Sequence, residues 1–200
     1  MRIHVDVTGL TGLVMHNGRL ADPLDPLAIE LSRLTDKRNR TEEEEREISD
    51  FEWLASLYYE KGLGTYIPAE NIVRCLRDAA TVWKLGEAVY DFVHVSTDLF
   101  TADGAPVVPV KHDGPADPRK LQKEDAFRLR KTVKIGRNRT PRTRPIFRTW
   151  GMSFDIDLDD TDLNLSDFER IAERAGRLEG IGTARKLGYG RFAATLSVAA

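Results

Sequence analysis

The order of strand and helix patterns along the chain predicts an α+β fold. Ile3, Val5 and Val7 alternate with polar residues, which is the period of a half-buried strand. The clearest strand shows the same period over residues 150–158, and one of its faces is expected in the core. The clearest helix begins near Ile67-Pro68, where a proline in the first turn precedes apolar residues at helical spacing. Strands and helices therefore alternate along the chain.

The remaining patterns complete the predicted order. A strand is expected over residues 90–100 and a final strand over residues 189–198. Between them, Ser166 and Glu169 form the sequence pattern of a capping box at the start of a helix. Without insertions, the order is strand, helix, strand, strand, helix, strand (βαββαβ). This is the ferredoxin-like pattern, which RRM-like RNA-recognition modules share.

We expect one domain over residues 1–200 that carries two insertions. The first insertion, over residues 20–62, is predicted to be helical, with one helix near residues 26–34 and another over residues 42–59. Thr41 is a suitable N-cap for the longer helix, whose first turn is acidic.

The second insertion, over residues 101–148, combines a Pro/Gly-rich loop with a basic arm. Glycine, asparagine and two prolines near the centre of the arm favour a β-hairpin or an extended arm over a helix. Residues 10–23 are predicted to be a loop with a turn at His16-Asn17-Gly18.

Composition limits the environment in which the chain works. Its 200 residues are 41% hydrophobic and 31% charged, as in an ordinary soluble domain. Cys75 is the single cysteine and cannot pair within the chain, so a reducing cytoplasm is expected. No apolar run approaches the roughly 18 residues of a membrane span, and no membrane partner is expected.

Charge is distributed unevenly along the chain. Residues 128–148 contain nine Lys or Arg and no Asp or Glu, whereas the whole chain has a formal net charge of −2. The other residues therefore carry −11, and residues 41–47 form one acidic run. An acidic partner such as a nucleic-acid backbone would be attracted to the basic arm.

The stretch "GIGTARKLGYGRF", residues 180–192, contains two G-x-G pairs around basic residues. A dinucleotide fingerprint requires a strand before it and a helix after it, but this stretch follows a helix and precedes a strand. A Walker A loop requires Lys-Ser or Lys-Thr after the last glycine, which is missing here. A nucleotide cofactor is therefore not expected, and no other cofactor is indicated.

The stretch resembles the glycine-rich loop of the RAMP (repeat-associated mysterious protein) superfamily, which supplies backbone and processing subunits to CRISPR complexes. Gly180-Ile181-Gly182 and Gly188-Tyr189-Gly190 match the two glycine pairs of that loop, after the last helix. Residues 67–77 resemble the helix start of backbone-type RAMP proteins, although they lack the usual Gly-Ser-Ser.

The resemblance implies a protein that binds single-stranded RNA, with single-stranded DNA as the alternative, and that has little sequence preference. It implies a homo-oligomer or filament along the strand, with other CRISPR effector subunits as further partners. A stand-alone or phage-encoded member is compatible with the sequence, and a phage-encoded member would work in the bacterial host cytoplasm. The predicted nucleic-acid-binding residues are Arg74, Arg77, Arg128, Arg130, Lys131, Lys134, Arg137, Arg139, Arg142, Arg144, Arg148, Gly180, Gly182, Arg185, Lys186, Gly188, Tyr189, Gly190 and Arg191.

Simpler interpretations of both basic elements stay open. The glycines of residues 180–190 are also those that a tight turn close to the sheet requires. The basic arm is also what a solvated hairpin that pairs with the chain's own acidic regions would look like.

Catalysis has weak support in the sequence. The motifs of zinc and serine hydrolases are missing, and no metal site is indicated. Processing RAMP enzymes cut RNA without metal and commonly use a histidine near the N-terminus, so His16 is the alternative catalytic residue of an endoribonuclease. His4, His94 and His112 have no evident partner in the sequence. A third alternative is a viral protein that mimics or competes with CRISPR effector subunits.

Overall fold

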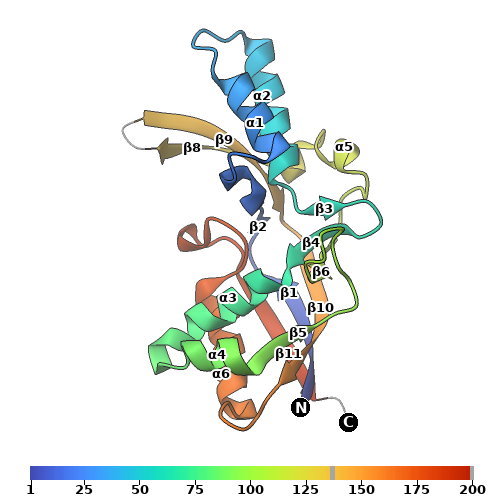
Figure 1. The fold of residues 1–200 in the computed structure, drawn as a ribbon, viewed down its shortest axis with the longest axis vertical. Helices are drawn as coiled ribbons and strands as arrows, with labels where there is room; N and C mark the ends of the chain where they lie inside the picture. Colours follow the sequence, from blue (N-terminus) through green and yellow to red (C-terminus); the bar gives the residue numbers. More distant parts are fainter. Residues whose placement is uncertain (136–137, 199–200) are drawn as a thin grey trace. The chain divides into compact units, whose positions relative to one another are not determined.

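The computed structural model describes residues 1–135 and 138–198, with the backbone alone at residues 134, 135 and 138. The chain is an α+β protein with antiparallel sheets, and Figure 1 labels its elements. Within the described residues no sheet is closed. Two compact units divide the chain. Unit 1 comprises Met1–Leu13, Tyr59–Asp113 and Arg148–Ala200, and unit 2 comprises Val14–Tyr58 and Gly114–Phe147.

The main sheet of unit 1 has the strand order β11-β1-β10-β5 and consists of antiparallel pairs. Its strands are β1 (Arg2–Gly9), β5 (Val93–Ser96), β10 (Trp150–Leu158) and β11 (Phe192–Val198), and the short β7 (Lys111–His112) also pairs with β10. Val5 lies opposite Phe154 on one side and Leu196 on the other. This register gathers the apolar positions of the strands on one face of the sheet.

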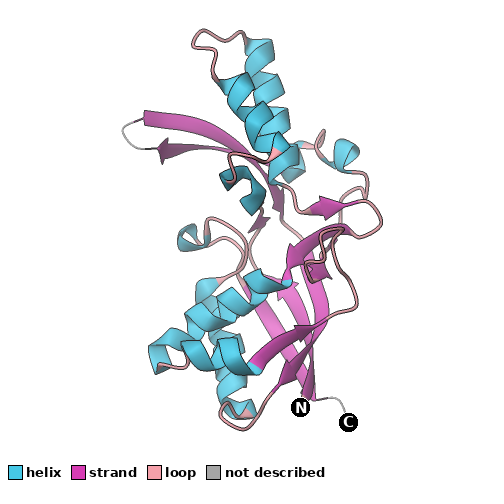
Figure 2. Cartoon of the chain, viewed as in Figure 1, coloured by secondary structure: helices cyan, strands magenta, loops and turns pink. Residues whose placement is uncertain are grey.

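Helices cover that apolar face, as Figure 2 shows by secondary structure. They are α3 (Ala69–Ala80), α4 (Gly86–Phe92) and α6 (Leu165–Arg174). Ile72 of α3 and Phe168 of α6 are buried together with Val5 and Val7 of β1. The six main elements of unit 1 follow the order strand, helix, strand, strand, helix, strand along the chain.

Unit 1 also contains a three-stranded sheet and several short helical turns. The sheet consists of β3 (Tyr59–Glu60), β4 (Gly64–Pro68) and β6 (Val107–Pro109). The turns are η2 (Thr81–Trp83), η4 (Ala175–Glu179) and η5 (Arg185–Leu187). β6 lies within residues 101–148, where the sequence predicted a Pro/Gly-rich loop before the basic arm.

Unit 2 combines two helices with a long hairpin. Its helices are α1 (Pro26–Thr35), α2 (Glu42–Ser56) and the short α5 (Pro118–Leu121), with the turns η1 (Gly18–Ala21) and η3 (Asp125–Phe127). Its sheet has the order β2 (Leu13–Val14), β9 (Asn138–Phe147), β8 (Arg128–Ile135). Trp53 of α2 is fully buried, and its indole N–H donates to the carbonyl of Phe127 at 2.8 Å. Thr41 and Glu44 form a capping box at the start of α2.

The basic arm is a hairpin of β8 and β9, paired from Arg128 with Pro145 to Ile135 with Asn138. We call β8 and β9 together the basic hairpin. The two prolines, Pro141 and Pro145, lie in β9, opposite Thr132 and Arg128. The basic arm is therefore regular secondary structure over the part that the structure describes.

Several predicted boundaries are wrong. Residues 90–92 end α4 and do not begin a strand, because Tyr90 lies on α4 with the Arg77 guanidinium 5.2 Å from its ring centre. The last strand begins at Phe192, since the residues before it form turns. α2 ends at Ser56, because Tyr59 pairs with Thr65 in a sheet.

Two predicted helix starts are also wrong. Ile67 and Pro68 belong to β4, and α3 begins one residue later at Ala69. The N-cap of α6 is Asn164, whose side chain accepts a hydrogen bond from the backbone N–H of Asp167 at 2.9 Å. Asparagine caps a helix as well as serine does, so the capping-box pattern at Ser166 was a coincidence. Residues 10–23, predicted to be loop, contain β2 and η1.

Candidate nucleic-acid interface

The glycine-rich loop, residues 180–191, folds back on itself through its two glycine pairs. Gly180, Gly182, Gly188 and Gly190 all have positive φ, between 71° and 86°. The N–H of Ile181 donates to the carbonyl of Gly190 at 2.9 Å. A Cβ atom on Gly190 would lie 1.9 Å from the carbonyl oxygen of Ile181, so no other residue fits there. The contact between the two glycine pairs therefore explains why Gly180 and Gly190 are glycines, and this explanation requires no ligand.

Further backbone contacts attach the glycine-rich loop to the segment after β1. Gly190 donates to the carbonyl of Gly12 at 2.9 Å, and Thr11 Oγ1 donates to the carbonyl of Gly188 at 2.8 Å. The thiol of Cys75 donates to the carbonyl of Gly180 at 3.1 Å. Burial raises the pKa of Cys75 to about 12, so this cysteine is an unreactive thiol at neutral pH.

Two arginines of the glycine-rich loop are occupied inside unit 1. Arg185 forms an ion pair with Asp78 of α3 at 3.1 Å, and Arg77 contacts the same carboxylate at 3.0 Å. Burial would raise the pKa of Asp78, but the hydrogen bonds from Arg77 and Arg185 hold it below the usual value. Arg191 donates to the carbonyl of Arg185 at 3.4 Å, and its Nη1 is buried without an acceptor among the described residues. Arg185 therefore holds the loop on α3.

The tip of the glycine-rich loop is exposed. Lys186 lies on the surface, and Leu187 is 71% exposed. Ala184 has a φ of 58°, a strained value for a residue with a side chain. No described residue accepts a hydrogen bond from the backbone N–H of Thr183, Ala184 or Lys186. The tip therefore combines a free cation with unpaired backbone donors.

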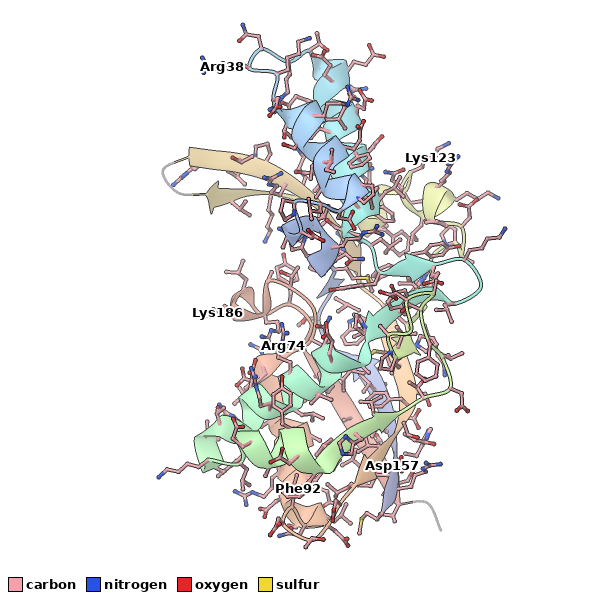
Figure 3. The ribbon with its side chains drawn as sticks, viewed as in Figure 1. Arg38, Arg74, Phe92, Lys123, Asp157 and Lys186 are labelled. Atoms are coloured by element: carbon pink, nitrogen blue, oxygen red, sulfur yellow. The ribbon has the colours of Figure 1, made fainter. Side chains whose placement is uncertain are left out.

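Helix α3 contributes one exposed cation to the same unit. Arg74 is exposed and has no described partner, whereas Arg77 is held by Asp78 and by the Tyr90 ring. Figure 3 labels Arg74 on α3 and Lys186 on the glycine-rich loop. Tyr189 is half-buried in the loop. The predicted residues of unit 1 thus separate into exposed cations and cations that hold the fold.

Three arginines of the basic hairpin pair with acidic residues of α2. Arg128 contacts Asp50 at 2.7 Å and also donates to the Ser49 hydroxyl. Arg130 lies 3.7 Å from Glu45. Arg142 forms an ion pair with the buried Glu52. Part of the basic hairpin therefore neutralises the chain's own acidic helix, as the simpler interpretation of the sequence proposed.

Other cations of the basic hairpin and its end stay on the surface. Arg139 and Arg148 are exposed without a described partner, and Lys131 is exposed as well. Arg137 and the side chain of Lys134 lie outside the described residues. Phe147, at the end of β9, is fully buried and is not available to stack on a base. The hairpin therefore presents exposed cations that a partner could contact, whereas the ring of Phe147 belongs to the core.

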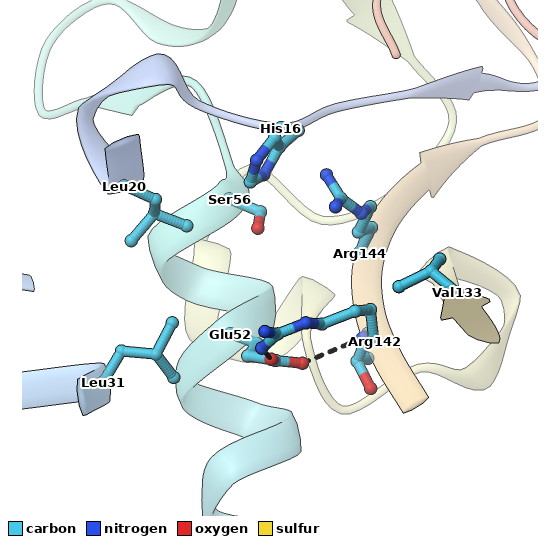
Figure 4. A pocket seen from close by; sticks show the side chains of 9 residues that line it. His16, Leu20, Leu31, Glu52, Ser56, Val133, Arg142 and Arg144 are labelled. Atoms are coloured by element: carbon cyan, nitrogen blue, oxygen red, sulfur yellow. Dashed lines mark hydrogen bonds and ion pairs between the residues drawn. The ribbon is translucent and has the colours of Figure 1, made fainter. Parts of the chain in front are cut away.

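His16 lies in a pocket of unit 2, beside Arg142 and Arg144 of β9 (Figure 4). Burial lowers the pKa of His16 to about 4, and the charges of Arg144 and Arg142 add to this effect. The backbone carbonyl of His16 accepts a hydrogen bond from the Tyr58 hydroxyl at 3.2 Å. At neutral pH this imidazole is uncharged and a weak base.

His4 has partners that the sequence did not reveal. Its Nδ1 lies 2.6 Å from Asp155, and its Nε2 lies 3.1 Å from the Ser153 hydroxyl, both on the neighbouring strand β10. The hydrogen bond to Asp155 raises the pKa of His4, and the nearby Asp6 adds to the effect. Strand alternation placed all three side chains on the polar face, but only the register could have predicted the contact.

Searches for metal clusters and membrane spans give no candidate in the described part of the chain. No group of three or more His, Cys, Asp or Glu side chains there is arranged to hold a metal ion. No described helix has both the length and the apolar composition for a membrane crossing.

Comparison of this chain with known proteins shows a similarity of structure and no match of sequence. No protein-family model matches the chain, and no curated protein matches it in sequence. Over its full length the chain is similar to a chain of the Type III-B Cmr-beta structure bound to cognate target RNA, with a TM-score of 0.50 and 12% identity. The fold resembles that of CRISPR complex subunits.

The match is distant and partial. The chain spans 61% of the Type III-B chain. A chain of a Type IV-B CRISPR complex matches with a TM-score of 0.46 and 13% identity, over 100% of this chain and 92% of that one. The shared property at this identity is the fold.

Proposed function

We propose that this chain is a RAMP-like subunit that binds single-stranded nucleic acid, RNA in preference to DNA, without reading its sequence. The ferredoxin-like connectivity of unit 1 and the position of the glycine-rich loop before its last strand support the RAMP assignment. The similarity to a chain of a complex bound to cognate target RNA supports RNA as the strand. In this proposal, copies of the chain assemble side by side along the strand.

The observation that carries the proposal is the set of exposed cations that internal ion pairs leave free. Among the predicted binding residues that the structure describes, these are Arg74, Arg148 and Lys186 in unit 1 and Arg139 in unit 2. A free surface cation loses no internal partner when it neutralises a phosphate, and it releases counterions. Phosphates carry no sequence information, so contacts of this kind bind strands of any sequence.

The proposal assigns no catalytic step to this chain. A histidine that acts as general base works best with a pKa near neutrality. The pKa of His16 is about 4, which argues against its role in RNA cleavage. A competitor of effector subunits would bind those subunits and have little affinity for a free strand.

Direct binding tests the proposal. Labelled single-stranded RNA, single-stranded DNA and duplex DNA of one length would be titrated with the chain at low salt, and each mixture would be imaged by electron microscopy. We expect binding to the single strands, tightest to RNA, with intact RNA at the end and assemblies whose length follows the strand. The absence of binding to either single strand at low salt would overturn the proposal.

A further inference from the structure

The pocket around His16 has the size of a ligand site, and its lining combines apolar and polar side chains as ligand sites do. Its volume is about 320 Å³, within the range of about 300–1,000 Å³ for small-molecule sites. It is formed within unit 2 by side chains of η1, α1, α2 and the basic hairpin, together with His16, which precedes η1 (Figure 4). Leu20, Leu31 and Val133 supply an apolar wall, and the remaining lining residues are polar: His16, Glu52, Ser56, Arg142, Thr143 and Arg144.

One of the two arginines in this pocket is already neutralised. Glu52 is only 5% exposed and forms an ion pair with Arg142. Its second carboxylate oxygen accepts a hydrogen bond from the backbone N–H of Thr143 at 3.0 Å. Both oxygens of Glu52 are therefore occupied, so this carboxylate offers little to a second cation.

The other arginine, Arg144, forms no ion pair with a described residue. Nη1 of Arg144 is buried and has no acceptor among the described residues. Burial lowers the pKa of Arg144, which indicates that its charge is held at a cost. His16, at the same end of the pocket, is neutral at pH 7 because its pKa is about 4. The pocket thus carries one positive charge that no described ion pair neutralises, and one buried N–H of that guanidinium has no described acceptor.

We propose that this pocket holds one nucleotide unit of the bound strand, with a phosphodiester oxygen on Arg144 and the base against Leu20, Leu31 and Val133. This inference rests on the proposed function. A phosphodiester has one negative charge and acceptor oxygens, so it matches a single guanidinium with an unpaired donor. The apolar wall of the pocket then covers the base. An inorganic anion would make no use of this wall.

The dinucleotide ApA is a suitable probe because it contains a single phosphodiester. Adenosine lacks the charge, and inorganic phosphate lacks the base. The ¹⁵N and ¹H resonances of the His16 imidazole would be followed by NMR in the full chain during titration with each compound. We expect ApA to shift the His16 resonances to saturation, and the two other compounds to bind at least tenfold more weakly.

Two variants make the test specific. Arg144→Gln should weaken ApA binding at least tenfold, whereas Lys123→Gln, which removes an exposed charge of unit 2 outside the pocket, should leave it unchanged. Leu31→Trp should fill the pocket and abolish the shift without altering any charged group, and an unchanged circular dichroism spectrum would show that each variant folds.

The outcomes separate the pocket from the general function. If ApA does not shift His16, or binds Arg144→Gln as tightly as the native chain, the pocket assignment is wrong even where labelled RNA still binds. If labelled RNA does not bind the native chain at low salt, the proposed function is wrong, whatever ApA does.

Discussion

The glycine-rich loop and the basic hairpin both concentrate positive charge, but different forces hold them in place. Backbone contacts that only glycine permits fix the loop, such as that between Ile181 and Gly190. Side-chain ion pairs with α2 fix the hairpin, such as that between Arg142 and Glu52. A side chain added to the backbone should therefore disrupt the loop, whereas loss of a carboxylate should disrupt the hairpin.

The comparison also shows that a run of basic residues overstates the charge available to a partner. Nine cations lie within residues 128–148, and three of them pair with carboxylates of α2. In the loop, Arg185 pairs with Asp78, and Lys186 beside it is free. Structural and binding cations are thus neighbours in both regions.

The largest effect is expected from Gly190→Ala in the glycine-rich loop. Its φ of 71° costs a residue with a side chain about 1–3 kcal/mol, and overlap with the Ile181 carbonyl adds to this. We therefore expect a loss of about 3 kcal/mol in the free energy of unfolding, measured in urea. Gly188→Ala is the control, because its φ is 86° but no atom lies within 4 Å of its added Cβ. Equal losses in the two variants would show that the close approach is unimportant.

In unit 2 the matching experiment is Glu52→Gln. This change keeps the shape of the side chain but leaves Arg142 without its counterion and weakens the hydrogen bond to Thr143. We expect a loss of about 2 kcal/mol in the free energy of unfolding, because the affected groups are largely buried. Glu42→Gln removes the exposed ion pair with Arg46 and should cost little. Equal effects of both variants would contradict a structural role for the hairpin's ion pair.

A smaller effect distinguishes the histidines of the two units. The pKa of His4 lies above 6.5, so its stabilising contribution is complete at low pH and is lost as the pH rises through the folded-state pKa. The pKa of His16 is about 4, so unfolding takes up a proton and stability falls as the pH drops from about 6.5 towards 4.

Titration of the two imidazoles by NMR checks these opposite shifts. We expect a midpoint above 6.5 for His4, which Asp155→Asn should lower, and a midpoint of about 4 for His16. A midpoint near 6.5 for His16 would mean that its pocket is open to water.

Period and turn chemistry were sufficient to predict the elements that have one clearly buried face. Strand β10 alternates buried and half-exposed residues from Trp150 to Leu158. The alternation of apolar and polar residues in its sequence is therefore the same as the alternation of buried and exposed residues in the structure. Helix α4 was missed because Tyr90 and Phe92 are common in strands, and its packing on α3 was decided by tertiary contacts. Local sequence was a good guide where burial is regular and a poor one where a distant element decides.

The sequence was sufficient to predict which types of residue form the candidate site. It was not sufficient to predict which residues pair with one another. The two glycine pairs and the basic run are visible in the sequence, but the ion pair between Arg185 and Asp78 joins positions 107 residues apart. The contact of Arg142 with Glu52 spans 90 residues, and that of His4 with Asp155 spans 151. Which cations stay free depends on such long-range contacts, so the folded structure was needed to separate them.

The central claim, that exposed cations and not the paired ones bind the strand, is tested most directly by the salt dependence of RNA binding in two triple variants. Each variant replaces three cations by glutamine and removes the same charge. The exposed set is Arg74, Arg139 and Lys186, and the paired set is Arg77, Arg128 and Arg185.

Each phosphate contact on a single strand contributes about −0.7 to the slope of log K against log salt. The account predicts that the exposed variant reduces the magnitude of this slope by about 2, while the paired variant keeps the native slope. An equal reduction in both variants, or a larger one in the paired variant, would contradict it.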